Sequence, residues 1–299
     1  MLIGMPGMPK STFKGIKMNL SDKAMLVRLS ISQWTARRLD VQATREVIQN
    51  YQAKPDAGRF NKLLVDVCAV KRYQKAANEA RVFHYANTLP WGEDDSRILP
   101  AANYSKYSAA MREYRAKFDA AVDEFIGEYP GLIGQAERDL NGLFRAADYP
   151  SAEALRFKFK FDYSVSPIEA AGDFRVELAA DEVDRIRADI EGRVEASVND
   201  AMADCWARLY GAVKHMADKL REPDAIFRDS LIGNIGELCD VLPRLNLTGD
   251  PKLTAVLDEV RAALVPLSPD KLRKFEVERK SATLAADGIL AKMAGYCGD

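Results

Sequence analysis

Few side chains of this sequence have the types and spacing that catalysis or metal binding requires. The two histidines are His84, between Phe83 and Tyr85, and His215, which lies far from any cysteine at metal-ligand spacing. A Ser-His-Asp triad would need one of them beside a nucleophile, and no Gly-x-Ser-x-Gly motif is present. The glycine-rich motifs that bind nucleotide phosphates are absent as well. We therefore expect a protein that is not an enzyme and that binds no cofactor.

Three consecutive carboxylates, those of Glu93, Asp94 and Asp95, could supply oxygen ligands to Mg²⁺. They lie between Leu89 and Pro100, where two prolines and a glycine indicate a loop. No second acidic cluster at useful spacing accompanies them, so a solvated turn is favoured and no metal site is expected. A metal-dependent hydrolase built on these carboxylates is the third hypothesis for function.

Basic and aromatic residues alternate in Leu155-Arg-Phe-Lys-Phe-Lys-Phe-Asp-Tyr163, which predicts a strand. Such a strand could track single-stranded nucleic acid, with bases stacked on rings and phosphates on cations. Strict alternation, however, places the rings on one face and the cations on the other, so the rings are better suited to a core. An alternative nucleic-acid-binding set consists of Arg28, Arg37, Arg38, Arg156, Lys158 and Lys160.

The net charge of −1 conceals an uneven distribution along the chain. Residues 1–80 hold 14 Lys and Arg against 6 Asp and Glu, whereas residues 81–299 hold 29 against 38. The basic first quarter could therefore meet nucleic acid, whose phosphates supply most non-specific affinity. It could equally meet the acidic remainder of the chain or a neighbouring copy.

Composition indicates a globular protein, because 47% of the residues are hydrophobic and 29% are charged. No apolar run approaches the roughly 20 residues of a membrane span, so no membrane partner is expected. Residues 1–20 are interpreted as a flexible tail without a signal peptide, which predicts a cytoplasmic protein. The cysteines, at 68, 205, 239 and 297, form no Cys-x-x-Cys pair and are expected to be reduced thiols.

The first half of the chain predicts one strand and several helices. Alternating residues at 25–34 predict a half-buried strand, and Asp40 can cap a helix that ends before Pro55. A second helix is expected from about 60 to 85. Apolar residues from Tyr107 to Tyr129 predict an amphipathic helix that Pro130-Gly131 stops, followed by a shorter helix at 132–146.

The second half predicts a long helix. Strands at 155–163 and 174–178 complete a three-stranded antiparallel sheet with the first strand, and an apolar stripe then continues from about 181 to 221. A helix of that length extends about 60 Å. It needs a partner along its stripe, either helices near 225–242, 252–264 and 269–294 or a second copy.

The fold class is thus α+β and mostly α, with a small sheet packed on helices and a long protruding helical hairpin or coiled coil. The expected division is a tail at 1–20, an α+β domain at 21–180, and the long helix with C-terminal helices at 181–299.

One segment resembles a known family. Phe83-His-Tyr-Ala-Asn-Thr-Leu-Pro-Trp91, with Arg97–Tyr104, Tyr129-Pro130 and Ala147–Pro150, resembles an uncharacterised protein family of tailed bacteriophages and prophages. The resemblance covers about residues 80–180, and the family has no established activity to carry over. Ser32-Gln-Trp34 followed by helices is similar to proteins encoded beside MoxR-type AAA+ ATPases, which would imply an adaptor role. No functional residue transfers from either resemblance.

The sequence therefore predicts a non-catalytic, phage-encoded accessory protein that self-associates and binds macromolecular partners. A homo-oligomer is expected, with a protein partner that the sequence does not identify. The alternative is a protein that binds or anneals single-stranded DNA, for which lambda Red beta-type annealases offer an analogy of a small sheet against helices.

Overall fold

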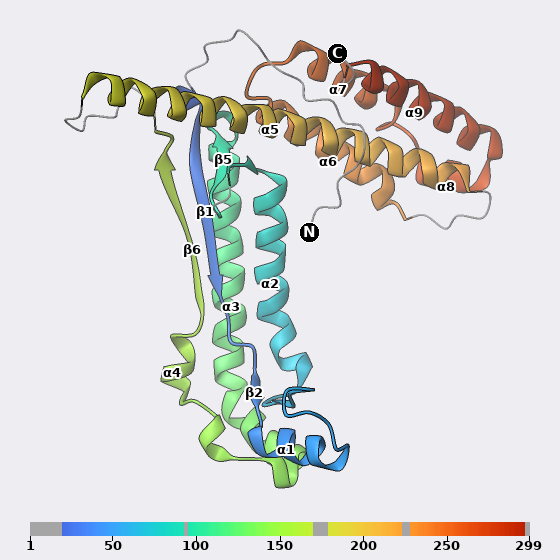
Figure 1. Ribbon diagram of the computed structural model, residues 1–299. Coiled ribbons are helices and arrows are strands. Elements are labelled where there is room, and N and C mark those ends of the chain that lie inside the picture. Colours follow the sequence, from blue (N-terminus) through green and yellow to red (C-terminus); the bar gives the residue numbers. More distant parts are fainter. Residues whose placement is uncertain (1–19, 93–94, 170–178, 223–227, 297–299) are drawn as a thin grey trace. The chain divides into compact units, whose positions relative to one another are not determined.

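The computed structural model describes residues 20–92, 95–169, 179–222 and 228–296 (Figure 1). Of the described residues, 69% are helical and 11% lie in strands, which confirms a mostly α member of the α+β class with a small antiparallel sheet. The strands are β1 (Ala24–Ser32), β2 (Arg37–Leu39), β3 (Asn61–Leu63), β4 (Leu89–Pro90), β5 (Arg97–Pro100) and β6 (Lys160–Pro167). The α-helices are α1 (Val41–Asn50), α2 (Val67–Ala86), α3 (Ala101–Leu140), α4 (Ala152–Arg156), α5 (Ala180–Arg221), α6 (Ser230–Leu245), α7 (Pro251–Ala263), α8 (Pro269–Lys274) and α9 (Glu276–Tyr296). Short 3-10 helices occupy Leu20–Asp22, Asn141–Leu143 and Ala146–Asp148.

The chain forms two compact units that interleave along the sequence. Unit 1 consists of residues 1–28, 85–106 and 165–299, and unit 2 of residues 29–84 and 107–164. The sequence predicts a boundary near residue 180, between an α+β domain and the long helix with the C-terminal helices. The observed division passes through β1, α2, α3 and β6, so neither unit is a continuous stretch of chain.

The main sheet has four strands in the order β4-β5-β1-β6, and β2 and β3 form a separate antiparallel pair. In unit 1, β1 pairs with β5 so that Ala24 lies opposite Pro100 and Val27 opposite Arg97. The predicted loop at 89–100 is therefore wrong at both ends, because β4 and β5 pair there. Both prolines lie at the last positions of these short strands, where a missing N–H disturbs the ladder least. The predicted strand at 174–178 falls outside the described residues.

The strand expected at 155–163 begins only at Lys160. Ser151 caps α4 by accepting a hydrogen bond from the Ala154 amide, and after α4 the Lys158 and Phe159 amides donate to the Leu155 and Arg156 carbonyls, which holds residues 157 and 158 in a turn. Phe157 consequently does not join the other rings: its side chain is 87% exposed, whereas that of Phe161 is buried. The alternation of basic and aromatic residues does not reveal the cap at Ser151, so the sequence predicts a strand that begins too early.

Unit 2 is built on α2 and α3, with an aromatic core between them. Tyr73 on α2 packs edge to face on Phe125 of α3 and on Phe159, with ring centroids 5.2 and 5.0 Å apart. Its hydroxyl donates a 2.8 Å hydrogen bond to the carbonyl of Trp34. The predicted stripe on α3 is confirmed as the buried face, with Tyr107, Met111, Phe118, Val122, Phe125 and Tyr129 all buried.

Two predicted helix boundaries in unit 2 are wrong. Helix α3 continues through Pro130 and Gly131 to Leu140, because Tyr129 before the proline and Ala136 after it are both buried. Packing of these residues offsets the local cost of proline in a helix. The helix expected from about residue 60 begins only at Val67, because residues 61–63 pair with β2.

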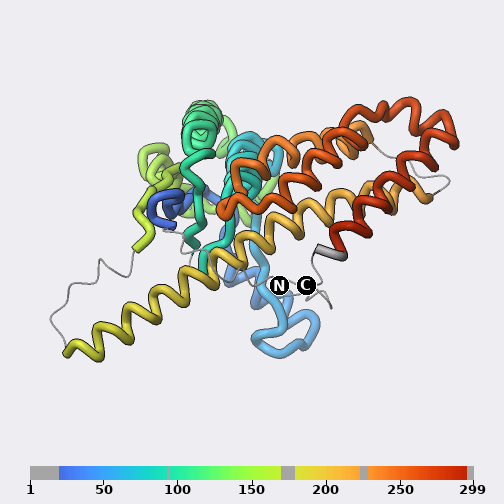
Figure 2. The backbone as a smooth tube through the Cα atoms, turned by 90° about the horizontal axis from the view of Figure 1, so that it is seen from above, coloured from blue at the N-terminus to red at the C-terminus, as the bar shows by residue number. Residues whose placement is uncertain are grey.

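Unit 1 is a helical bundle around α5. The predicted long helix is confirmed, and α5 packs most extensively on α9 and next on α6, so partners for its apolar stripe come from the same chain. The two halves of α5 differ. Most of its buried residues lie between Ala201 and Leu220, whereas only Ile190 is buried before that point. Figures 1 and 2 show this first half extending past the ends of α6–α9.

We expect Pro130→Ala to stabilise the protein by about 1–3 kcal/mol, because alanine restores an amide donor in the middle of α3. Gly131→Ala is the matched control, with an expected gain of about 0.5–1 kcal/mol, since nothing lies within 4 Å of the added Cβ. Urea unfolding measures both free energies. A helix that stops at Pro130 in solution would show no gain from either substitution.

Candidate interaction surfaces

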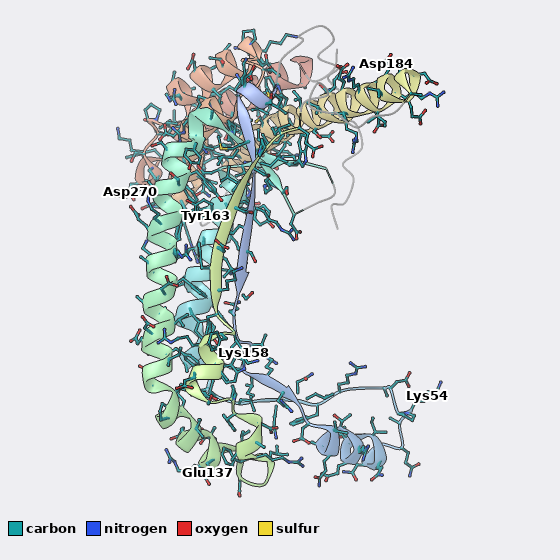
Figure 3. All side chains as sticks on the ribbon, turned by 90° about the vertical axis from the view of Figure 1, so that its left-hand side faces the viewer. Lys54, Glu137, Lys158, Tyr163, Asp184 and Asp270 are labelled. Carbon is teal, nitrogen blue, oxygen red and sulfur yellow. The ribbon has the colours of Figure 1, made fainter. Side chains whose placement is uncertain are left out.

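Residues 37–63, called here the basic tip, present an exposed surface that is both basic and apolar. They comprise β2, α1, the 51–60 loop and β3, and they project sideways from one end of α2 and α3, with Lys54 at the outer edge (Figure 3). Five cations of the tip are exposed against two carboxylates, those of Glu46 and Asp56; the cations are Arg37, Arg38, Arg45, Lys54 and Arg59. Of the fifteen large apolar side chains exposed among the described residues, six lie here: Leu39, Val41, Val47, Tyr51, Phe60 and Leu63.

The basic tip has almost no apolar core of its own. Helix α1 has ten residues and buries only Ala43, so packing contributes little to its stability. Its first turn is fixed instead by Asp40, the predicted cap, whose side chain accepts a 3.0 Å hydrogen bond from the Ala43 amide. The exposed face of the β2–β3 pair holds Arg37, Leu39 and Leu63.

A buried lysine holds the parts of the tip together. The Lys62 ammonium lies 3.0 Å from Asp40 Oδ2 and 2.7 Å from Asp148 Oδ2, and it donates a 2.7 Å hydrogen bond to the Leu143 carbonyl. The Lys62 and Asp40 side chains are only 2% and 3% exposed. Three segments of the chain therefore meet at one charge: the start of α1, β3, and the turn after α3.

The ionisation of this cluster is tied to the fold. The amide hydrogen bond from Ala43, followed by the bond from Lys62, lowers the pKa of Asp40 below its ordinary value. Burial by itself lowers the pKa of Lys62, but the hydrogen bonds to Asp148 and Asp40 outweigh this, so the pKa is raised. Both groups are thus held in their charged forms.

The predicted nucleic-acid residues do not all come together. Arg37 and Arg38 lie on the basic tip, and Arg38 is 3.5 Å from Asp148. Arg28 belongs to unit 1, where it pairs with Asp95 at 3.1 Å.

Farther along unit 2, Arg156 and Lys160 pair with carboxylates, at 2.7 Å from Asp123 and 3.6 Å from Asp162. Lys158 is exposed and has no ion pair within the described part of the chain. Four of the six predicted cations are thus already neutralised.

Sequence reasoning missed the residues that make the tip distinctive. Arg45, Lys54 and Arg59 have no ion pair among the residues described, and the Tyr51 side chain is 81% exposed. The available signal was a tyrosine and a phenylalanine at either end of a loop with Pro55 and Gly58 and with basic residues between them. The sequence does not indicate that Lys62 is buried, because a lysine beside an apolar residue is ordinarily expected to be exposed.

In unit 1, two arginines hold the segment on which the resemblance to a phage family rests. Arg208 donates 2.9 Å hydrogen bonds to the carbonyls of Ala86 and Thr88, so it satisfies the end of α2. Arg97 Nε donates to Thr88 Oγ1 at 2.7 Å, and its guanidinium lies over the Tyr85 ring. Burial, with the nearby charge of Arg208, lowers the pKa of Arg97. The guanidinium groups of Arg97 and Arg208 thus donate hydrogen bonds to Thr88 and to backbone carbonyls, which indicates a structural role.

The candidate chemical residues do not assemble into a site. His84 is buried with Nδ1 2.7 Å from the Tyr107 hydroxyl, and His215 is exposed on α5. Among the described residues, no group of three or more His, Cys, Asp or Glu could hold a metal; Glu93 and Asp94 lie outside them.

The cysteines fit a structural interpretation. Cys205 and Cys239 are free and buried, and burial raises the pKa of Cys205 to about 12. Cys68 is free and exposed, whereas Cys297 is not described.

Comparison with protein-family models, with curated proteins and with solved structures gives no match to this chain. No residue role is therefore carried over from a related protein, and the surfaces above rest on their own contacts. Within the described residues, no helix combines the length and the apolar composition needed to cross a membrane.

Lys62→Met is expected to lower the free energy of unfolding by about 3–5 kcal/mol, because it leaves the buried Asp40 without its paired cation and removes the nearer of the two cations at Asp148. Lys54→Met removes an exposed lysine of the same tip and should change stability by less than about 0.5 kcal/mol. Chemical denaturation followed by circular dichroism compares the two. Equal stability of the variants would show that the buried ammonium does not hold the tip.

Stability of the tip should depend on pH at both extremes. The lowered pKa of Asp40 gives stability that is present above its ordinary value of 3.8 and is lost as pH falls through the folded-state value. The raised pKa of Lys62 gives stability that is present below 10.5 and is lost as pH rises through its folded-state value. Amide protection factors of residues 41–50, which correct for the intrinsic pH dependence of exchange, should fall in both windows in the wild type. In Lys62→Met, the alkaline effect should disappear.

Proposed function

We propose that this protein is a non-catalytic, phage-encoded accessory protein of the cytoplasm that acts by self-association and by binding macromolecular partners. The basic tip is the surface through which it associates. The observation that carries the proposal is the concentration of exposed apolar side chains on the tip, beside cations without ion pairs among the described residues. A mixed surface of this kind is characteristic of protein interaction sites.

The way the tip is held supports this role. A surface loop with no binding role needs no fixed shape, yet here a buried lysine, two carboxylates and a helix cap fix one conformation. Burying charge in this manner is a costly way to gain stability. It does fix the positions of the exposed side chains, and preorganisation lowers the entropy that binding must overcome.

Binding of single-stranded nucleic acid is the second candidate. Tyr51 and Phe60 beside Lys54 and Arg59 favour it, because exposed rings can stack bases while cations meet phosphates. The aliphatic members of the tip argue for protein, since Leu39, Val47 and Leu63 give nucleic acid little to bind. A protein partner is therefore the better supported of the two.

We expect the double variant Leu39→Ser, Tyr51→Ser to weaken self-association by about tenfold or more, because two exposed apolar anchors are lost. The matched control is Val277→Ser, Leu284→Ser on α9, where the side chains are 80% and 72% exposed. Sedimentation velocity over a range of protein concentrations gives the association constants.

Association that is equally strong in the tip variant and in the α9 control would contradict the proposal. A labelled single-stranded oligonucleotide, titrated at low and moderate salt, tests the second candidate. Salt-sensitive binding that the tip variant loses, without any self-association of the wild type, would favour nucleic acid instead.

A further inference from the structure

The first half of α5 presents an exposed acidic surface in unit 1. Residues 180–200, called here the acidic arm, hold seven carboxylates and three arginines, all exposed. Two arginines are already paired within the arm, Arg185 with Glu182 and Arg193 with Asp189. Five carboxylates are left without an ion pair among the described residues: Asp181, Asp184, Glu191, Glu195 and Asp200.

Four of these carboxylates share one face of the helix. Asp181, Asp184, Glu191 and Glu195 are spaced by three, seven and four residues, which places them within about a quarter of the helix circumference. The apolar stripe, whose buried member is Ile190, lies on the opposite side. The acidic face spans about 21 Å along α5, and Figure 3 shows Asp184 near its free end.

Small residues between the carboxylates give a partner access to the helix backbone. Ala188 and Gly192 lie on the same face, both are exposed, and nothing lies within 4 Å of the position of a Cβ at Gly192. Apolar side chains of a partner can therefore pack between the acidic groups. The face combines net negative charge with shallow apolar contacts, which is the complement of a surface that is basic and apolar.

Resting on the function proposed above, we propose that the acidic arm of one copy is bound by the basic tip of a second copy. Four carboxylates of the arm, those of its acidic face, meet the four cations of the tip that lack an ion pair in the described chain: Arg37, Arg45, Lys54 and Arg59. The first half of α5 buries only Ile190 in its own unit, so its acidic face is accessible to the tip of a second copy.

The contact uses two different surfaces, and each copy offers one tip and one arm. Two copies that exchange tip and arm form a closed two-fold dimer, whereas copies that add head to tail continue until a ring closes or a filament grows. The strength of such a contact depends on salt, because the charges at its rim are exposed.

Charge reversal tests the pairing. The tip variant carries Arg45→Glu and Arg59→Glu, and the arm variant carries Asp184→Lys and Glu191→Lys. Each alone places like charges together and should weaken self-association by about tenfold or more. An equimolar mixture of the two, or all four substitutions in one chain, restores opposite charges and should restore association. Arg112→Glu, Arg115→Glu on α3 reverses two exposed cations outside both surfaces and should leave association unchanged.

Sedimentation velocity at low and high salt, with circular dichroism to confirm folding, separates the outcomes. Loss in both variants with recovery in the mixture supports the pairing. If the tip variant loses association and the arm variant keeps it, the tip binds elsewhere, so the pairing is wrong while the proposed function stands. If the wild type stays monomeric at all concentrations, the pairing and the proposed self-association are both wrong.

Discussion

The presentation of the basic tip depends on one buried ammonium. Lys62 joins β3 to the cap residue of α1 and to Asp148 after α3, and hydrogen bonds from the Asp40 amide to the Phe60 carbonyl and from Arg145 to Gln42 link the same segments. A cluster of this kind gains less free energy than an apolar core would, because both charges must leave water. What it gives is a single arrangement, since the ammonium bonds all three segments only in that arrangement. A stiff tip with exposed apolar groups follows from this constraint.

Each unit combines an apolar core with a charged surface that takes little part in that core. Unit 1 buries a large apolar cluster in which most of the second half of α5 takes part, and it leaves the first half of that helix as an acidic extension. Unit 2 places its aromatic core between α2 and α3 and leaves the tip almost coreless. In each unit, residues outside the core form a charged surface: the basic tip of unit 2 is positive, and the acidic arm of unit 1 is negative. The described histidines and cysteines do not come together in one site: His84 contacts Tyr107, and Cys205 and Cys239 are buried as free thiols.

The sequence could predict what periodicity controls. The helix at 180–221, the strand at 24–32 and the cap at Asp40 follow from apolar spacing and one capping side chain. Features that depend on tertiary packing could not be predicted, such as α3 continuing through Pro130 between two buried neighbours. Nor could the short pairs β2–β3 and β4–β5, which have too few residues for a pattern. Of the candidate site, Arg37 and Arg38 were predicted; Lys62 was not, because its partners Asp40 and Asp148 are distant in sequence.

In the proposed assembly, the basic tip of one copy binds the acidic arm of another, so each surface is shielded from solvent by the other. Hydrogen exchange measured at low and at high protein concentration tests this directly, because it reports each segment separately. The account predicts that protection at residues 41–51 and at residues 181–195 rises together with concentration, while protection of the exposed face of α9 around Leu284 does not change. Protection that is independent of concentration in the tip and the arm, or that rises in only one of them, would contradict it.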